Sequence, residues 1–198
     1  MRKMSDCIKT DVFISGGGPV GLLIAYSLAR QGVQSVLVGK TTPSPPSISL
    51  QQRIIMHQNL TKAEQHNKEN QAMYGRATTL YPRTLEMLDQ LDLLEDLNQI
   101  GYIGRNSVTY KDGKRVTSRG WHVMFERMHG TYLDYCLNLR QKYSEGVFGE
   151  AYAGVGGRAF VGWVLEGFVV DDDSAEGDYR VVSRMREVET GRVVTVKR

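Results

Sequence analysis

The sequence predicts an α/β fold, and three observations support this class. The apolar run Val12–Ile14 leads into a cluster of glycines and then into an amphipathic helical pattern. A second apolar run, Ser35–Val38, follows that pattern. The C-terminal part is rich in strand-like residues, over 159–170, 179–189 and 192–196. A strand, a helix and a strand in succession indicate a βαβ unit with a parallel sheet, and the later strands indicate an added antiparallel β-meander.

Composition and charge exclude several classes of function. The chain has 198 residues, of which 41% are hydrophobic and 24% charged, as in soluble globular proteins. Its net charge of +3 is small, and no basic run carries interleaved aromatic residues, so we expect no nucleic-acid partner. The N-terminus lacks an apolar signal region, and no apolar stretch reaches the roughly eighteen residues of a membrane span. These features predict a cytoplasmic protein that does not bind a membrane.

Cysteine and histidine residues do not form a ligand pattern. Cys7 and Cys136 suggest neither a disulfide framework nor a metal knuckle, which favours a reducing compartment. His122, His129 and Cys136 recur every seven residues, but we interpret this region as strands and loops, where that spacing gives no common face. The sequence therefore predicts no metal site.

The glycine cluster has the spacing of a dinucleotide-binding turn. Gly16, Gly18 and Gly21 fit the pattern G-x-G-x-x-G between the first strand and the first helix. In that motif the first glycine permits a tight turn, the second lets a pyrophosphate approach the backbone, and the third lets the helix pack closely on the strand. Pro19 and Val20 open the helix, whose N-terminal N–H groups suit an anion. The cluster predicts a Rossmann-like dinucleotide site, and the alternative is an ordinary glycine-rich turn in another α/β domain.

The end of the second strand departs from this motif. A dinucleotide site normally has an acidic residue here that binds the adenosine ribose hydroxyls, but this chain has Gly39. Loss of one charge-assisted hydrogen bond costs about 1.5–3 kcal/mol of binding free energy, which weakens such a site without abolishing it. Lys40 offers electrostatic attraction to a phosphate instead.

The middle of the chain begins with a change of composition. Residues 41–73 open with clustered prolines and continue with Gln, Asn, His and Lys, which predicts a disordered insertion. Pro82 then suits a first helical turn, and apolar residues predict one amphipathic helix that ends at Gly101. Its apolar stripe comprises Leu85, Met87, Leu88, Leu91, Leu94 and Leu97.

Three further elements are expected before the C-terminal strands. The run 107–116 predicts a β-hairpin that turns at Asp112-Gly113. Strand-like residues continue over 121–125, and the pattern from Leu137 to Tyr152 predicts a helix.

At this point the sequence resembles the class A flavoprotein monooxygenases, which act on aromatic rings, and within them the fungal phenol 2-monooxygenase-like hydroxylases. The resemblance rests on residues 11–23, on Gly75-Arg-Ala with 82–88, and on 139–145. It implies a glutathione-reductase-like FAD domain, of which 1–198 is the N-terminal and apparently truncated part. In that domain 102–136 begins an excursion toward the substrate domain.

The resemblance also implies site residues and chemistry. The three motif glycines would cradle the FAD pyrophosphate, and Arg76 and Gln141 would face the FAD. Arg83 and Glu145 could equally be structural, in salt bridges on their helices. The implied activity is that of an oxidoreductase, a monooxygenase that hydroxylates a phenolic or other aromatic substrate with NAD(P)H and O2. Catalytic residues are not assigned, and a homodimer is one option for its assembly.

Two motifs of that family are missing from the chain. One is an Asp-Gly sequence after a strand, and the other is a Gly-Asp sequence whose aspartate contacts the ribityl chain. Asp112-Gly113 and Gly177-Asp178 match these dipeptides, but the first lies in a predicted hairpin turn and the second precedes Tyr-Arg, where the family has small residues and a helix. We therefore expect an incomplete chain without turnover of its own, and a non-catalytic flavoprotein fragment is an alternative. A less favoured alternative is a nicotinamide-dependent dehydrogenase, for which Tyr110 and Lys114 have the Tyr-x-x-x-Lys spacing.

Overall fold

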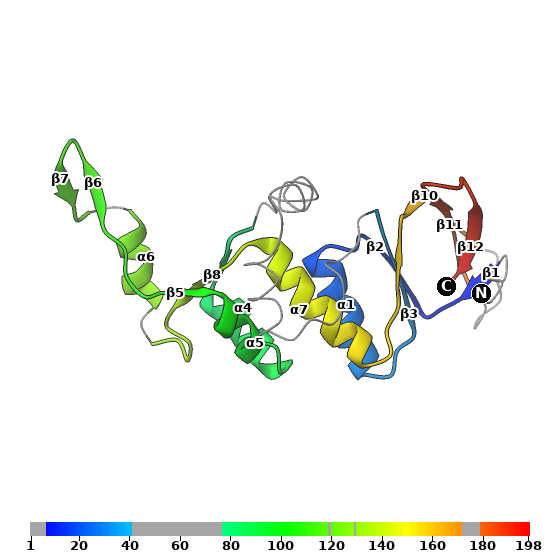
Figure 1. The fold of residues 1–198 in the computed structure, drawn as a ribbon, viewed down its shortest axis with the longest axis horizontal. Helices are drawn as coiled ribbons and strands as arrows, with labels where there is room; N and C mark the ends of the chain where they lie inside the picture. The colour runs from blue at the N-terminus through cyan, green and yellow to red at the C-terminus, as the bar shows by residue number, and fades with distance from the viewer. Residues whose placement is uncertain (1–6, 41–76, 119, 129, 172–178) are drawn as a thin grey trace, which may run out of the picture. The chain divides into compact units, whose positions relative to one another are not determined.

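A computed structural model describes residues 7–40, 77–118, 120–128, 130–171 and 179–198 (Figure 1). The chain divides into two compact units. The first unit combines residues 1–72 with 148–198, and the second comprises 73–147. The predicted insertion at 41–73 lies outside the described residues.

The first unit contains the predicted βαβ arrangement. Strand β2 (Val12–Ser15) is followed by helix α1 (Pro19–Arg30) and by β3 (Ser35–Gly39), which pairs with β2 in parallel. A third parallel strand, β9 (Ala159–Val161), joins the other edge of β3, so the strand order is β2-β3-β9. Helix α1 ends at Arg30, and Gly32, with a φ of +77°, follows it where the chain turns toward β3. The mixed α/β class is confirmed.

A second sheet in the same unit contains the predicted meander, except that Ala159–Val161, the start of the predicted strand 159–170, forms β9 in the first sheet. Strands β10 (Trp163–Val170), β11 (Val181–Glu187) and β12 (Val193–Lys197) pair antiparallel in succession. Strand β1 (Cys7–Lys9) completes the sheet by pairing with β12 in parallel. We did not predict β1, because Ile8 is its only strongly apolar residue and a three-residue strand carries little pattern.

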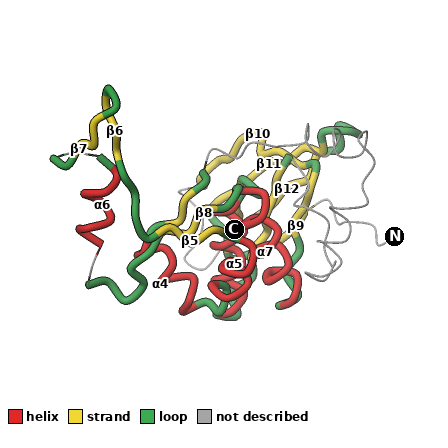
Figure 2. Tube along the Cα trace, turned by 60° about the vertical axis from the view of Figure 1, so that its left-hand side comes forward, coloured by secondary structure: helices red, strands yellow, loops and turns green. Residues whose placement is uncertain are grey.

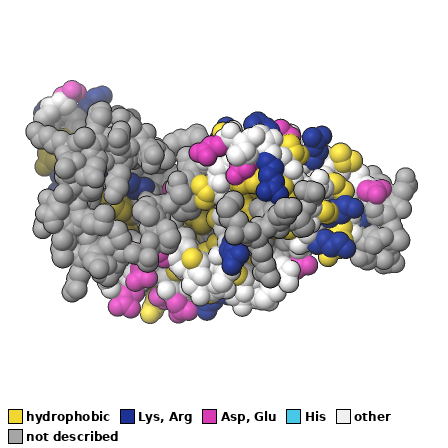
Figure 3. All heavy atoms as spheres, turned by 45° about the vertical axis from the view of Figure 1, so that its right-hand side comes forward, with side chains coloured by type: hydrophobic (Ala, Val, Ile, Leu, Met, Phe, Trp, Pro, Cys, Tyr) yellow, Lys and Arg dark blue, Asp and Glu magenta, His cyan; other side chains and the backbone are white. Residues whose placement is uncertain are grey.

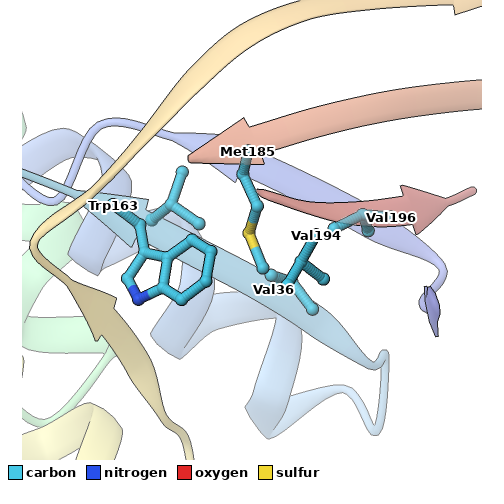
Figure 4. Packing of buried hydrophobic residues seen from close by; sticks show 6 residues of the cluster. Val36, Trp163, Met185, Val194 and Val196 are labelled. Atoms are coloured by element: carbon cyan, nitrogen blue, oxygen red, sulfur yellow. The ribbon is translucent and has the colours of Figure 1, made fainter. Parts of the chain in front are cut away.

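The core of this unit lies between the two sheets. Val36 and Val38 of β3 pack in one cluster with residues of the second sheet (Figure 4). Trp163 is 5% exposed and packs edge-on against Phe160. The cluster comprises Val36, Val38, Trp163, Met185, Val194 and Val196. Alternate residues of β3, Val36 and Val38, thus pack against the meander. A strand that is covered on both faces is a nearly continuous apolar run.

The second unit contains a small antiparallel sheet in the order β4-β8-β5. Its strands are β4 (Thr79–Leu80), β8 (Cys136–Asn138) and β5 (Tyr102–Gly104). Strand β8 corrects our helix prediction for 137–152, because helix α7 begins only at Gln141 and extends to Gly154.

The single helix predicted between Pro82 and Gly101 is wrong. The chain forms α4 (Pro82–Gln90) and α5 (Leu94–Ile100), separated by a turn in which Asp92 adopts a φ of +59°. Leu93 N–H donates to the Leu88 carbonyl at 2.9 Å, which closes the end of α4. The break buries both Leu93 and Leu94, whereas a straight helix would bring only one of two adjacent residues to the same stripe. Met87, which we placed on the apolar stripe, is 52% exposed.

The remaining elements give one confirmation and one correction. Strands β6 (Thr109–Lys111) and β7 (Lys114–Val116) form the predicted hairpin, with positive φ at Asp112 and Gly113 as a two-residue turn requires. Residues 121–125 are not strand-like but belong to helix α6 (Trp121–Met128), which Figure 2 shows as a separate helix after the hairpin. Their alternating large side chains fit both a strand and one side of a short helix.

Candidate functional site

The glycine turn joins the carboxyl end of β2 to the start of α1. Gly16 has a φ of +124°, which a residue with a side chain rarely adopts. Its N–H donates to the Val38 carbonyl at 2.8 Å, so the turn is tied to the end of β3. The tight turn predicted for Gly16 is present.

Gly21 provides the close packing of α1 against the turn. A Cβ atom at this position would lie 1.9 Å from the Gly16 carbonyl oxygen and 3.3 Å from Cδ1 of Leu37. A side chain here would collide with backbone that cannot move without breaking the turn. Steric contact with backbone therefore requires glycine at position 21, whereas a Cβ at Gly16 would meet nothing within 4 Å.

The N-terminus of α1 has the features of an anion site. Gly18 is the N-cap in an extended conformation, no side chain caps the helix within the described residues, and Pro19 occupies the first helical turn. Because proline has no N–H, Val20 and Gly21 offer the first backbone donors inside the helix. Val20 is 70% exposed, so this end opens to solvent. Free donors and the positive end of the helix dipole suit a phosphate.

The structure gives a physical reason for Gly39. A Cβ atom on Gly39 would lie 2.9 Å from both the Cα and the N atom of Gly17. The turn backbone thus rests directly on the end of β3, and a side chain at 39 would push it away. Gly39 is a packing requirement of this particular turn, and sequence reasoning missed the Gly17–Gly39 contact because it joins residues on two different elements.

Lys40 follows β3 directly and is exposed. Its proposed attraction to a phosphate stays a prediction. Arg76 lies outside the described residues, so its role also stays a prediction.

Gln141 begins helix α7 in the second unit and has protein partners there. Its Nε2 donates to Oε1 of Glu145 at 2.7 Å, and the Ala77 N–H points to its Oε1 at 3.5 Å. These contacts hold the amide between the chain before β4 and the first turn of α7. Arg83 pairs with Glu86 on α4 at 3.1 Å, although 84% of its side chain is exposed.

The motif look-alikes have ordinary structural roles. Asp112-Gly113 is the turn of the β6–β7 hairpin, which places Tyr110 and Lys114 on opposite strands instead of on one helix face. The Tyr-x-x-x-Lys arrangement of a dehydrogenase is therefore absent at these residues. Gly177-Asp178 lies outside the described residues.

Other chemistry-bearing residues in the described part of the chain form no site. No cluster of His, Cys, Asp and Glu suited to a metal ion occurs among the residues that the structure describes. Cys136 is buried, 3.9 Å from the sulfur of Met128, and burial raises the pKa of its thiol. Among the described residues in Figure 3, Lys and Arg side chains are dispersed, with hydrophobic side chains between them. None of the described helices is long and apolar enough to cross a bilayer.

Comparisons with known proteins show which proteins this chain resembles. A protein-family model described as an FAD binding domain matches residues 9–56, which include the glycine turn, α1 and β3. A curated FAD-dependent monooxygenase of Aspergillus terreus is 28% identical over 108 residues, which cover 54% of this chain and 12% of that protein. The chain thus spans only a small part of the relative's length.

Solved structures, two of them named as monooxygenases, share the fold. The p-nitrophenol 4-monooxygenase of Pseudomonas putida matches 98% of this chain and 40% of its own, with a TM-score of 0.65 at 20% identity. The flavin-dependent monooxygenase PieE, solved with FAD and substrate, matches 96% of this chain and 29% of its own, with a TM-score of 0.61 at 22% identity. PqsL of P. aeruginosa, in complex with 2-aminobenzoylacetate, has a TM-score of 0.64 at 19% identity and matches 95% of this chain and 41% of its own.

The site fits the cofactor that the family model names. The first turn of α1 exposes backbone donors, and the turn before it consists of glycines, so phosphate oxygens can approach the backbone. FAD is thus the cofactor of this fold.

Proposed function

We propose that this chain is the FAD-binding part of a flavin-dependent monooxygenase that hydroxylates a phenolic or other aromatic substrate with NAD(P)H and O2. One observation carries the proposal: the glycine turn, with its steric need for Gly21, lies within the segment that matches an FAD binding domain. A dinucleotide turn by itself serves many enzymes. The combination with monooxygenase relatives in both comparisons favours this activity.

The residues of the first unit have distinct roles in this proposal. Gly16 and Gly18 keep the turn free of side chains, and the N–H groups of Val20 and Gly21 hold the pyrophosphate. Pro19 sets the start of the helix, and Lys40 adds positive charge at the end of β3. Arg76 and Gln141 belong to the same proposal as contacts to the FAD. When bound, FAD supplies the redox chemistry that activates O2 for transfer to a ring.

An aromatic substrate is favoured by what is known of the relatives. One of them is a p-nitrophenol 4-monooxygenase, and another was solved with 2-aminobenzoylacetate. The protein's own contribution to such a reaction is to orient the ring and to exclude water from the flavin. We further propose a cytoplasmic location, and a homodimer as one form of assembly.

A second candidate function is that of a flavin-binding chain without turnover. The chain spans 12% of the curated relative's length and 40% of the p-nitrophenol enzyme's. The Asp-Gly and Gly-Asp motifs that contribute to the flavin site in the resembling family are also missing from its sequence in their expected contexts.

Titration with FAD tests the binding part of the proposal. We expect the chain to bind FAD with quenching of flavin fluorescence, and Gly18→Val to abolish binding because a β-branched side chain would stand where the pyrophosphate meets the backbone. Gly167→Val is the matched control, since a Cβ at Gly167 meets nothing within 4 Å. Equal FAD affinity of the Gly18 variant and the unchanged chain would place the site elsewhere.

An activity assay separates the two candidates. The chain is incubated with FAD, NADPH and a panel of simple phenols, and hydroxylated product is measured by mass spectrometry. FAD binding without product above background supports the flavin-binding chain without turnover. Coupled hydroxylation supports a competent monooxygenase.

A further inference from the structure

We infer that the solvent side of the β-meander binds the acidic surface of helices α4 and α5 on a second copy of this chain. The meander face is the solvent side of the sheet formed by β1, β12, β11 and β10, and the acidic surface is the exposed side of α4 and α5. The inference specifies an interface for the proposed homodimer and does not depend on the proposed FAD site.

The strand register defines which residues belong to the meander face. Met185 and Val194 are paired on the opposite side of the sheet, where they pack in the core (Figure 4). Successive residues of a strand alternate between the two sides of a sheet, and directly paired residues share a side. Arg184 and Arg186, which flank Met185, therefore lie on the meander face, and 65% of the Arg184 side chain is exposed.

Four valines make this face more apolar than the solvent side of a sheet usually is. Val169 of β10 is 69% exposed, and its partner on β11 is Val182. Val164 and Val193 both pair with Arg186, so they lie on the same side. Antiparallel sheets with one buried face normally carry polar residues on the other face. Exposed apolar side chains that lie together among polar ones are typical of an interaction site.

The charged residues of the meander face are mostly cations. Lys9 and Lys197 are directly paired in the register of β1 and β12, and both are exposed. Like charges at directly opposed positions destabilise a sheet, so carboxylates over this pair would stabilise it. Among the described residues of the four strands, Glu166 is the carboxylate on this side, 2.6 Å from Arg186 and 4.0 Å from Arg184. Four cations against one carboxylate leave the face positive.

A surface of opposite charge lies on α4 and α5. Residues 84–100 contain five carboxylates and no Lys or Arg. Glu86 pairs with Arg83, which directly precedes this segment. Met87 of α4 is 52% exposed and adds an apolar side chain to the surface. The exposed carboxylates are those of Asp89, Asp92, Glu95 and Asp96.

The two surfaces are complementary in charge and similar in construction. Each has exposed apolar side chains among charges of mainly one sign, and the two signs are opposite. Protein interfaces combine apolar contacts with complementary charges that orient the partners. Because one chain carries both surfaces, a second copy supplies the partner and association needs no other component.

Sedimentation velocity of the whole chain measures the association. We expect the mass to rise from one copy toward two as the protein concentration increases at low salt. At about 0.5 M salt, which screens exposed charges, we expect the mass of one copy. Val169→Ser removes apolar contact area from the meander face at an exposed position, so it should weaken the association without unfolding the chain.

Charge reversal tests each surface separately. Lys9→Glu combined with Lys197→Glu should weaken self-association at least about tenfold, and so should Asp89→Lys combined with Glu95→Lys, because each brings like charges together. All four positions are exposed, and circular dichroism verifies that the variants are folded. The matched control makes the same change of net charge on the β6–β7 hairpin, with Lys111→Glu and Lys114→Glu, and should associate like the unchanged chain.

An equimolar mixture of the two charge-reversed proteins tests whether the two surfaces meet. In the mixture, each reversed surface finds a surface of opposite sign on the other protein. We therefore expect the mixture to associate with about the affinity of the unchanged chain, although neither variant associates well alone.

Each outcome decides the inference. A chain that keeps the mass of one copy at every concentration would overturn it together with the proposed homodimer, whereas the FAD titration tests the proposed activity separately. Association that withstands charge reversal at Lys9 and Lys197 would place the interface elsewhere. Equal weakening in the hairpin control would assign the effect to net charge alone. A mixture that does not associate would show that the meander face and the acidic surface do not meet.

Discussion

The βαβ unit and the stretch from β5 to β8 differ in what determines their structure. In the βαβ unit, backbone atoms approach one another so closely that particular positions accept only glycine, as at Gly21 and Gly39. In the stretch from β5 to β8, the elements are short and contacts such as that of Cys136 with Met128 are between side chains. A backbone constraint leaves a readable mark on the sequence, whereas side-chain packing accepts several residue types at each position.

The strongest test of this contrast is Gly21→Ala. Its Cβ would stand 1.9 Å from the Gly16 carbonyl oxygen, so we expect a loss of more than about 3 kcal/mol in unfolding free energy, above the usual cost of overpacking, and loss of FAD binding. Urea unfolding and FAD titration measure the two effects. Gly154→Ala is the control, because a Cβ there meets nothing within 4 Å. A stable Gly21 variant that binds FAD would refute the steric account.

Side-chain packing in the second unit is tested by a pair of neighbouring residues. Leu88 is fully buried on α4 and Met87 is 52% exposed, although the sequence pattern assigned both to the apolar stripe. We expect Leu88→Ala to lower the unfolding free energy by about 3 kcal/mol and Met87→Ala to change it by less than about 0.5 kcal/mol. Thermal and urea unfolding provide the comparison. Similar losses in both variants would mean that α4 packs with a different face.

How far the sequence predicts the structure follows from the same contrast. The turn, α1 and β3 were predicted because glycine spacing and apolar runs report backbone geometry directly. Helix α6 was predicted as a strand because alternating large residues over a few positions fit both states. The α4–α5 break was missed because the leucine spacing continues across it. Asp92 adopts a left-handed conformation there, and the neighbouring residues do not predict that conformation.

The candidate site was predictable in part for the same reason. The glycine turn at its proposed phosphate end is encoded by local spacing, and the structure contains that turn. The reason for Gly39 was not, because it depends on a contact with Gly17 that exists only in the folded chain. The site residues of the second unit, such as Gln141, came from the family resemblance and remain proposals.

A substitution at Gly39 distinguishes two explanations for the glycine: a lost ribose contact and a packing requirement of the turn. If Gly39 were only a lost ribose contact, Gly39→Asp would restore a hydrogen bond and strengthen FAD binding. Since its Cβ would lie 2.9 Å from the Gly17 backbone, we expect instead a loss of about 1–2 kcal/mol in stability, typical of overpacking, and FAD binding at least tenfold weaker. Gly167→Asp, at an open position, controls for the added charge. Tighter FAD binding by Gly39→Asp would contradict the packing account.

The smallest effect is expected at Arg83, which the family resemblance left undecided between a structural and a functional role. The Arg83 guanidinium pairs with Glu86 one turn along α4, and most of its side chain is in solvent. Ion pairs on a helix surface contribute about 0.3–0.5 kcal/mol. We therefore expect Arg83→Ala to lower the unfolding free energy by less than about 0.5 kcal/mol and to leave FAD affinity unchanged. Arg105→Ala, which removes another exposed ion pair of the second unit, with Asp134, is the matched control. A drop in FAD affinity in the Arg83 variant, with unchanged stability and no drop in the control, would assign Arg83 to the cofactor site and extend that site into a region where sequence spacing gave no sign of it.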